Sequence, residues 1–193
     1  MLRKTKVLLL LLLAASLIAV SVVEISAQSA ESPEITIRKV EAQTMLYTVY
    51  RGSYEKIGQT ISDLYALAGK NKLTPCGPLT LVYLNNPKTS TMEHCLTEIR
   101  IQVSQEANSL AGKLGPMTDV KTLNSMDVAI MTKSVGQYDY AGLFEKIYSW
   151  IVKSGYRPVD SPCEVFSAGQ QQNYEQMKSE IMIPIVKVSS IKQ

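Results

Sequence analysis

Apolar and polar positions alternate cleanly near the end of the chain, in the stretch EIMIPIV (Glu180–Val186). On a β-strand, successive side chains point to opposite faces. Ile181, Ile183 and Ile185 therefore share one face, and the glutamate with Met182 and Pro184 occupies the other. We predict that the isoleucine face packs beneath helices, because burying each such side chain contributes roughly 1.5–3 kcal/mol.

An earlier stretch, EIRIQV (Glu98–Val103), has the same rhythm and the same leading glutamate. Its polar face differs, because Arg100 lies two residues from Glu98 and within reach of a salt bridge. Glu180 instead has Met182 beside it and no basic residue on its own strand. A carboxylate on an apolar surface is costly unless it is compensated, either by a cationic ligand or by protonation. The alternative is that this face is wet and Glu180 is solvated.

Helical periodicity appears in two segments, roughly Tyr54–Ala68 and Tyr140–Lys153. Apolar residues recur there at steps of three and four, which predicts amphipathic helices. Each helix follows an apolar strand and precedes two more strands, the second of which begins with glutamate. Gly69 and Gly155 stand where a helix end favours a left-handed residue.

These patterns repeat once, with a period slightly above eighty residues. The halves span about residues 35–103 and 120–188, and a polar connector spans 104–119. A single repetition is too little for a solenoid and is typical of a duplicated domain. The predicted fold is therefore α+β, with duplicated β-α-β-β units. A further strand, Ile35–Val40, is expected to lead into the first half.

The first 30 residues have the order of a secretory signal or signal anchor: a basic head, an uncharged apolar run from Val7 to Val23, and a polar segment. The run is at the lower edge of the length that spans a bilayer. Basic residues ahead of it keep the N-terminus in the cytoplasm. We therefore expect the rest of the chain to be extracytoplasmic, either secreted or anchored to the membrane by this segment.

The composition excludes several classes of function. The 193 residues carry a formal charge of +3 without a basic stripe, so nothing indicates nucleic acid. The single His94 and three cysteines lack the spacing of a metal site, and we expect no metal and no cofactor. One disulfide is allowed in an oxidising compartment. The ten tyrosines suit the wall of a pocket, since the ring is apolar and its tip polar.

The segments RGSYEKIG, GPLTLVY with the following NNP, and EIMIPIV together resemble the GyrI-like small-molecule-binding domain. That family includes effector-binding domains of AraC- and MerR-type regulators and is related to the SOUL fold. The resemblance covers residues 34–188. It implies two halves related by a pseudo-twofold axis, joined antiparallel sheets with helices packed on them, and a ligand groove between the halves.

The resemblance also implies a function, the binding of amphipathic and often cationic aromatic compounds by a tyrosine-lined groove with a glutamate. The ligand-binding residues that it implies are Glu180, Tyr50, Tyr54, Tyr83, Tyr138, Glu98 and Met182. No DNA-reading segment precedes the domain in this sequence. The partner is therefore expected to be a small molecule.

Two alternatives stay open at this point. One is a hydrolase of electrophilic small molecules that uses a Glu/Tyr pair, as some stand-alone relatives are credited with. The other is a haem- or peptide-binding module, for which His94 supplies no specific ligand geometry.

Overall fold

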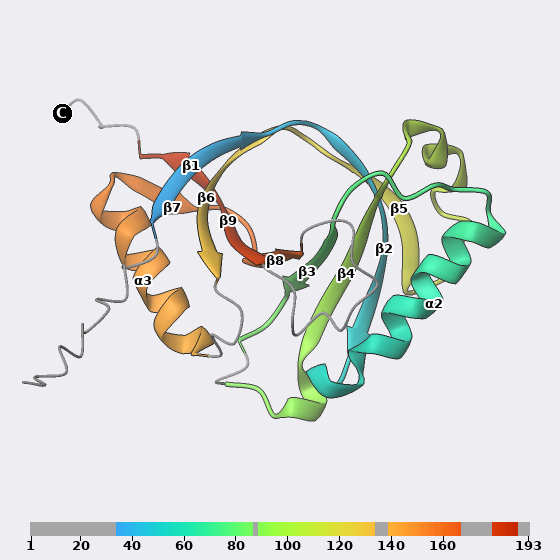
Figure 1. Ribbon diagram of the computed structural model, residues 1–193, viewed down its shortest axis with the longest axis horizontal. Helices are drawn as coiled ribbons and strands as arrows, with labels where there is room; N and C mark the ends of the chain where they lie inside the picture. The colour runs from blue at the N-terminus through green and yellow to red at the C-terminus, as the bar shows by residue number, and fades with distance from the viewer. Residues whose placement is uncertain (1–33, 87–88, 134–138, 167–178, 189–193) are drawn as a thin grey trace, which may run out of the picture. The chain divides into compact units, whose positions relative to one another are not determined.

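The computed structural model describes residues 34–86, 89–133, 139–166 and 179–188. In these residues, nine strands form one sheet, and two α-helices and three 3₁₀ turns accompany it (Figure 1). The strands are β1 (Ile35–Val40), β2 (Gln43–Arg51), β3 (Leu79–Tyr83), β4 (Leu96–Val103), β5 (Thr118–Leu123), β6 (Met126–Lys133), β7 (Tyr156–Pro158), β8 (Cys163–Phe166) and β9 (Ser179–Lys187). The helical elements are η1 (Tyr54–Lys56), α2 (Ile57–Lys70), η2 (Met92–His94), η3 (Gln105–Leu110) and α3 (Tyr140–Lys153).

Every pairing in the sheet is antiparallel, and the strand order is β1-β6-β9-β8-β3-β4-β2-β5, with β7 paired to β9. This confirms the predicted α+β class and the antiparallel sheet with helices packed on it. The strand–helix–strand–strand order is present in each half, and the second half adds the short β7. The duplication itself and its pseudo-twofold axis stay predictions.

The strand that precedes each half pairs with the other half. β1 was expected to lead into the first half, but it pairs with β6 of the second. β5 overlaps the predicted connector, which contains η3 as well, and it pairs with β2 of the first half. The sequence did not predict β5 as a strand. Its alternation is weak, because its residues are mostly half-buried.

The register of the sheet decides which side chains share a face. One row across the strands runs through Ile99, Leu81, Glu164, Ile181 and Met131, each paired with the next. Directly paired residues point to the same side of a sheet. The isoleucines of β9 therefore lie on the same face as Leu81 of β3 and Ile99 of β4, which we call the helix face.

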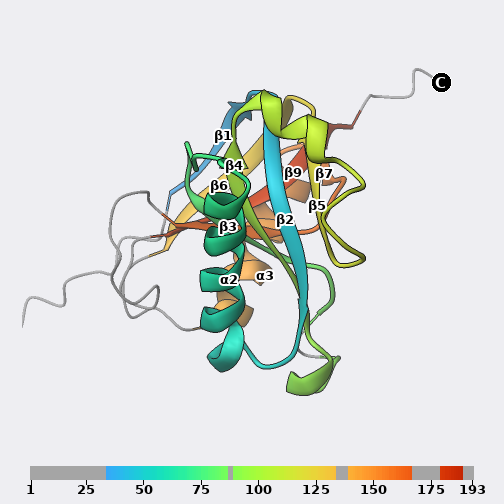
Figure 2. The same ribbon diagram turned by 90° about the vertical axis from the view of Figure 1, so that its right-hand side faces the viewer.

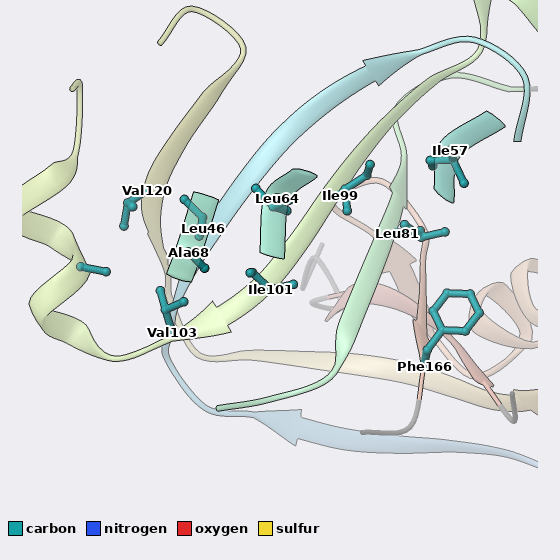
Figure 3. Close-up of a cluster of buried hydrophobic side chains, with 11 residues drawn as sticks. Leu46, Ile57, Leu64, Ala68, Leu81, Ile99, Ile101, Val103, Val120 and Phe166 are labelled. Carbon is teal, nitrogen blue, oxygen red and sulfur yellow. The ribbon is translucent and has the colours of Figure 1, made fainter. Parts of the chain in front are cut away.

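Both helices pack on the helix face. Leu64 and Ala68 of α2 belong to one buried cluster with Leu46, Leu81 and Ile101, and Figure 3 shows this cluster together with Phe166 of β8. On the other side of the sheet's centre, α3 packs on β6 and β9. That second cluster contains Leu143, Ile147, Ile151, Ala129, Met131, Ile181, Ile183 and Ile185. The prediction that the β9 isoleucines pack beneath a helix is confirmed. Figure 1 shows the helices on either side of β3 and β8, and in Figure 2 α2 lies in front of α3.

Local chemistry fixes the ends of the helices. The Asp139 side chain accepts a hydrogen bond from Gly142 N at 3.0 Å and caps the start of α3. Gly155, just past its end, has φ +77° as predicted. The prediction for Gly69 is wrong, because α2 continues to Lys70 and Lys72 takes the positive φ of 58°.

None of the helices among the described residues is long and apolar enough to cross a bilayer, and the N-terminal apolar run lies outside those residues. Cys76, Cys95 and Cys163 are free thiols. Burial raises the pKa of the Cys163 thiol to about 12, so this thiol is protonated at neutral pH.

Candidate functional site

Two hollows lie next to each other on the helix face, where the two halves of the chain meet. The inner cavity has a volume of about 250 Å³ and is lined by Tyr54, Ile57, Leu81, Tyr83, Tyr140, Phe144, Glu164 and Phe166. The outer cleft, of about 820 Å³, is lined by Tyr83, Leu84, Asn85, Asn86, Asp139, Tyr140, Ala141, Phe144, Glu145, Tyr148, Ser161 and Pro162. They share Tyr83, Tyr140 and Phe144, so the two hollows adjoin across these rings.

The inner cavity is built from both halves. Residues of η1, α2 and β3 form one side, and residues of α3 and β8 form the other. The central strands β3 and β8 pair with each other, so Leu81 and Glu164 lie side by side at its floor. This position agrees with the groove predicted between the halves.

Aromatic rings form a continuous wall through both hollows. Tyr83 lies at its centre and contacts Tyr54 and Phe144 edge to face, with ring centroids 5.8 Å and 6.0 Å away. Phe144 is 6.4 Å from Tyr140 and 6.5 Å from Tyr148. Tyr140, Phe144 and Tyr148 follow one another at four-residue steps, so they share one face of α3.

The polar centre of the inner cavity is Glu164, whose exposed fraction is only 1%. One of its oxygens, Oε1, accepts hydrogen bonds from Lys133 Nζ at 2.8 Å and from Ser179 Oγ at 2.5 Å. The other, Oε2, accepts from Tyr83 Oη at 2.6 Å and from Tyr140 Oη at 3.2 Å. Four donors from β3, β6, β9 and α3 therefore hold this carboxylate in one orientation.

Burial and the carboxylate change the acidity of these donors. Burial, and then the neighbouring Glu164, raise the pKa of Tyr83 well above its ordinary value and also raise that of Tyr140. Burial alone would lower the pKa of Lys133, but its hydrogen bonds to Glu164 and Tyr140 outweigh burial and the pKa is raised. At neutral pH the two phenols are thus protonated donors and Lys133 is a cation.

The structure brings two of the predicted ligand-binding residues, Tyr54 and Tyr83, to the cavity. Tyr50 does not line it; its ring packs against the first core cluster and its hydroxyl donates to Ser53 O at 3.0 Å. Tyr138 lies outside the described residues.

The predicted acidic residues are on the opposite face of the sheet. Glu180 accepts two hydrogen bonds of 3.1 Å from Arg38 of β1. Its basic partner therefore comes from another strand, which β6 separates from β9. Glu98 is paired with Arg100, as the sequence predicted, and also with Lys121 at 2.6 Å. Met182 lines a small hollow on that same face.

The carboxylate at the cavity is thus Glu164 and not Glu180. The register explains the difference, because Glu164 pairs with Ile181, while Glu180 pairs with Val165. Alternation along β8 and β9 puts Glu164 among the isoleucines and Glu180 with Met182 on the other side.

Sequence reasoning missed Glu164, Lys133, Tyr140 and Phe144. The sequence did contain a signal for Tyr140 and Phe144. Together with Tyr148 they recur at four-residue steps along the predicted helix over Tyr140–Lys153, which places three aromatic rings on one face of that helix. Glu164 stands two residues before Phe166 in CEVF, so alternation links it to an apolar face. Nothing in the sequence connects it with Lys133, since strand pairing through β9 brings them together.

The fold and the aromatic cavity define the class of protein, a ligand-binding α+β domain. A family model described as the GyrI-like small molecule binding domain matches residues 33–186. The chain belongs to this family, and residues 33–186 form a small-molecule-binding domain. No curated protein shows a significant match to the sequence.

Solved structures with the same fold share little sequence with this chain. The crystal structure of the EcmrR C-terminal domain is similar with a TM-score of 0.64 and 16% identity, over 81% of this chain and 99% of that one. EcmrR in its DNA complex is similar with a TM-score of 0.65 and 15% identity over 80% of this chain. The matched region spans only 58% of the EcmrR chain. A hydrolase encoded by lin2189 of Listeria innocua is similar with a TM-score of 0.58 and 13% identity, over 84% of this chain and 97% of that one.

Proposed function

We propose that this chain binds amphipathic aromatic small molecules, with an aromatic part of the ligand in the hollows between α2 and α3. The observation that carries the proposal is the set of six aromatic residues, Tyr54, Tyr83, Tyr140, Phe144, Tyr148 and Phe166, that line adjoining hollows of about 250 and 820 Å³. Apolar hollows with a few fixed polar groups are typical of small-molecule sites.

The outer cleft favours a ligand that carries a positive charge. Asp139 and Glu145 are exposed at its lining, and its described lining residues include no lysine or arginine. Aromatic faces attract cations as well. EcmrR, whose C-terminal domain shares the fold, is seen bound to DNA, and we propose only the effector-type binding for this chain.

Fluorescence titration of the purified protein with rhodamine 6G, an amphipathic cation, tests this function. Phe144 lines both hollows, so Phe144→Ala should weaken binding at least about tenfold, equivalent to about 1.4 kcal/mol. Val152→Ala on the same helix is the matched control, because Val152 is exposed and lies outside both hollows. Equal affinities for the two variants and the wild type would contradict the proposal.

A second candidate is a hydrolase of electrophilic small molecules, since Tyr83 Oη and Glu164 Oε2 lie 2.6 Å apart at the cavity. A Glu/Tyr pair of this kind can act as acid and base, and one structure with the same fold is described as a hydrolase. Turnover of reactive esters and epoxides that disappears in both Tyr83→Phe and Glu164→Gln would support it. Equal turnover by these variants and the wild type would exclude it.

We further propose that residues 1–30 export the domain or anchor it to the membrane. The support is the order of basic head, apolar run and polar segment in the sequence. Cell fractionation, with N-terminal sequencing of the mature chain, distinguishes a secreted from an anchored form. Recovery of the unprocessed chain in the cytoplasm alone would refute this proposal.

A further inference from the structure

Lys133 is a buried cation behind the inner cavity, where it does not line the hollow but contacts Glu164 and Tyr140, which do. It is the last residue of β6, and only 8% of it is exposed. Its register partner on β9 is Ser179, which contacts the same oxygen of Glu164. The ammonium group is therefore held inside the protein by two neighbouring strands and does not extend into solvent.

The contacts of the Lys133 ammonium are those that a bound cation would seek. It lies 2.8 Å from Glu164 Oε1, 2.5 Å from Tyr140 Oη and 4.4 Å from the centroid of the Tyr140 ring. A carboxylate combined with an aromatic face is a strong site for a cation once water is excluded. Here that site is occupied by a side chain of the protein itself.

We propose that Lys133 acts as a built-in cation that makes the inner cavity selective for neutral aromatic groups and leaves the positive charge of a ligand in the outer cleft. This inference rests on the proposed function and specifies the ligand chemistry of each hollow. The reason is electrostatic: Glu164 and Lys133 together carry no net charge. A second cation near Glu164 would lose its water and also face the ammonium group.

The lining of the two hollows agrees with this division. Around the inner cavity, the described lining residues other than Glu164 are apolar residues and tyrosines. The outer cleft carries the carboxylates of Asp139, which also caps α3, and Glu145; among the described residues neither forms an ion pair. A molecule with a neutral ring system at one end and a cationic group at the other therefore matches the site in one orientation.

Two leucines allow each hollow to be observed separately. Leu81 lines only the inner cavity and Leu84 only the outer cleft. With methyl-labelled leucine, NMR titrations can follow both residues during addition of N-methylquinolinium or of its neutral isostere, 1-methylnaphthalene. In the wild type, the Leu81 methyl groups should report an affinity for the neutral probe at least about tenfold tighter than for the cation, equivalent to about 1.4 kcal/mol.

Substitutions of Lys133 provide the second part of the experiment, a test of whether its charge causes this selectivity. Lys133→Gln removes the charge and keeps a donor near Glu164, so the affinity for N-methylquinolinium at Leu81 should rise at least about tenfold. The double variant Lys133→Gln/Glu164→Gln should lose this gain. Lys121→Gln is the matched control, because Lys121 is paired with Glu98 on the opposite face. The dispersion of the leucine spectrum verifies that each variant is folded.

The outcomes separate this inference from the function on which it rests. If neither probe shifts Leu81 or Leu84 in any variant, the proposed function fails and the inference fails with it. If both bind but N-methylquinolinium reaches Leu81 of the wild type as tightly as the neutral probe, the inference alone is overturned. That wild-type comparison is decisive even if Lys133→Gln does not fold. In a folded Lys133→Gln protein, an unchanged affinity for the cation also overturns the inference.

Discussion

Replacing Lys133 by methionine should strongly destabilise the domain. The substitution keeps an unbranched side chain of similar length but removes the cation from Glu164, which is 1% exposed. The carboxylate would keep its three hydroxyl donors, from Ser179, Tyr83 and Tyr140, and lose its ion pair. Removing one partner of a buried pair typically costs about 3–5 kcal/mol of unfolding free energy, because the other charge is left uncompensated.

Two ion pairs, one between β6 and β8 and the other between β1 and β9, give a scale for this loss of unfolding free energy. The side chains of Lys133 and Glu164 are 10% and 1% exposed, whereas those of Arg38 and Glu180 are 54% and 30% exposed. Exposed pairs contribute about 0–1 kcal/mol, since water and salt screen them. Arg38→Met is therefore a matched control that should lower the stability by less than about 1 kcal/mol.

Urea unfolding followed by the fluorescence of Trp150, which packs against the α3 cluster, provides the measurement. With an m-value of about 2 kcal/mol/M, Lys133→Met should lower the unfolding midpoint by about 1.5–2.5 M. Lys133→Met/Glu164→Gln should recover part of this loss, because a neutral amide oxygen still accepts from the hydroxyl groups. A midpoint for Lys133→Met equal to that of Arg38→Met would refute the argument that the buried carboxylate depends on this cation.

Three further outcomes are expected. Ile183→Ala should lower the free energy of unfolding by about 2–5 kcal/mol in the same urea assay, because Ile183 is fully buried. Val186 is exposed, so the control Val186→Ala should change it by less than about 0.5 kcal/mol. Tyr83→Phe should cost about 1.5–3 kcal/mol, since it removes a hydrogen bond to a charged group and keeps the ring; no measurable change would contradict the bond. Burial raises the pKa of Tyr54 to about 12 from 10.0, so stability should fall as the pH rises from 10 to about 12, and Tyr54→Phe should reduce that fall.

The elements with strong periodicity were predictable from the sequence. The helix over Tyr140–Lys153 agrees with α3 residue by residue, and the strands led by glutamate are β4 and β9. These segments alternate or recur because one side is buried, so the pattern records a physical constraint. β5 was missed because most of its residues are half-buried, and β7 because its three residues are mostly exposed, so neither strand imposes such a pattern.

The composition of the site was less predictable than its place. Tyrosines of the expected kind line the cavity, but the carboxylate came from β8 and its cation from β6. Alternation alone already separated Glu180 from the isoleucines beneath α3, and therefore from the helix face that carries the cavity. Identifying Glu164 required the register of β8 against β9, which depends on tertiary structure and is not written in any local pattern.

The exchange of β1 and β5 between the halves has a consequence for how this domain is made. Ile35 pairs with Met131 and Gln43 with Leu123, so each half of the sheet needs a strand from a distant part of the chain. Contacts of such high sequence separation slow folding, because loop closure precedes the gain from pairing. A fragment that ends after β4 would lack β5 and leave one edge of β2 bare, exposed to pairing with another chain. During synthesis, the first half must therefore wait for the second before its sheet is complete.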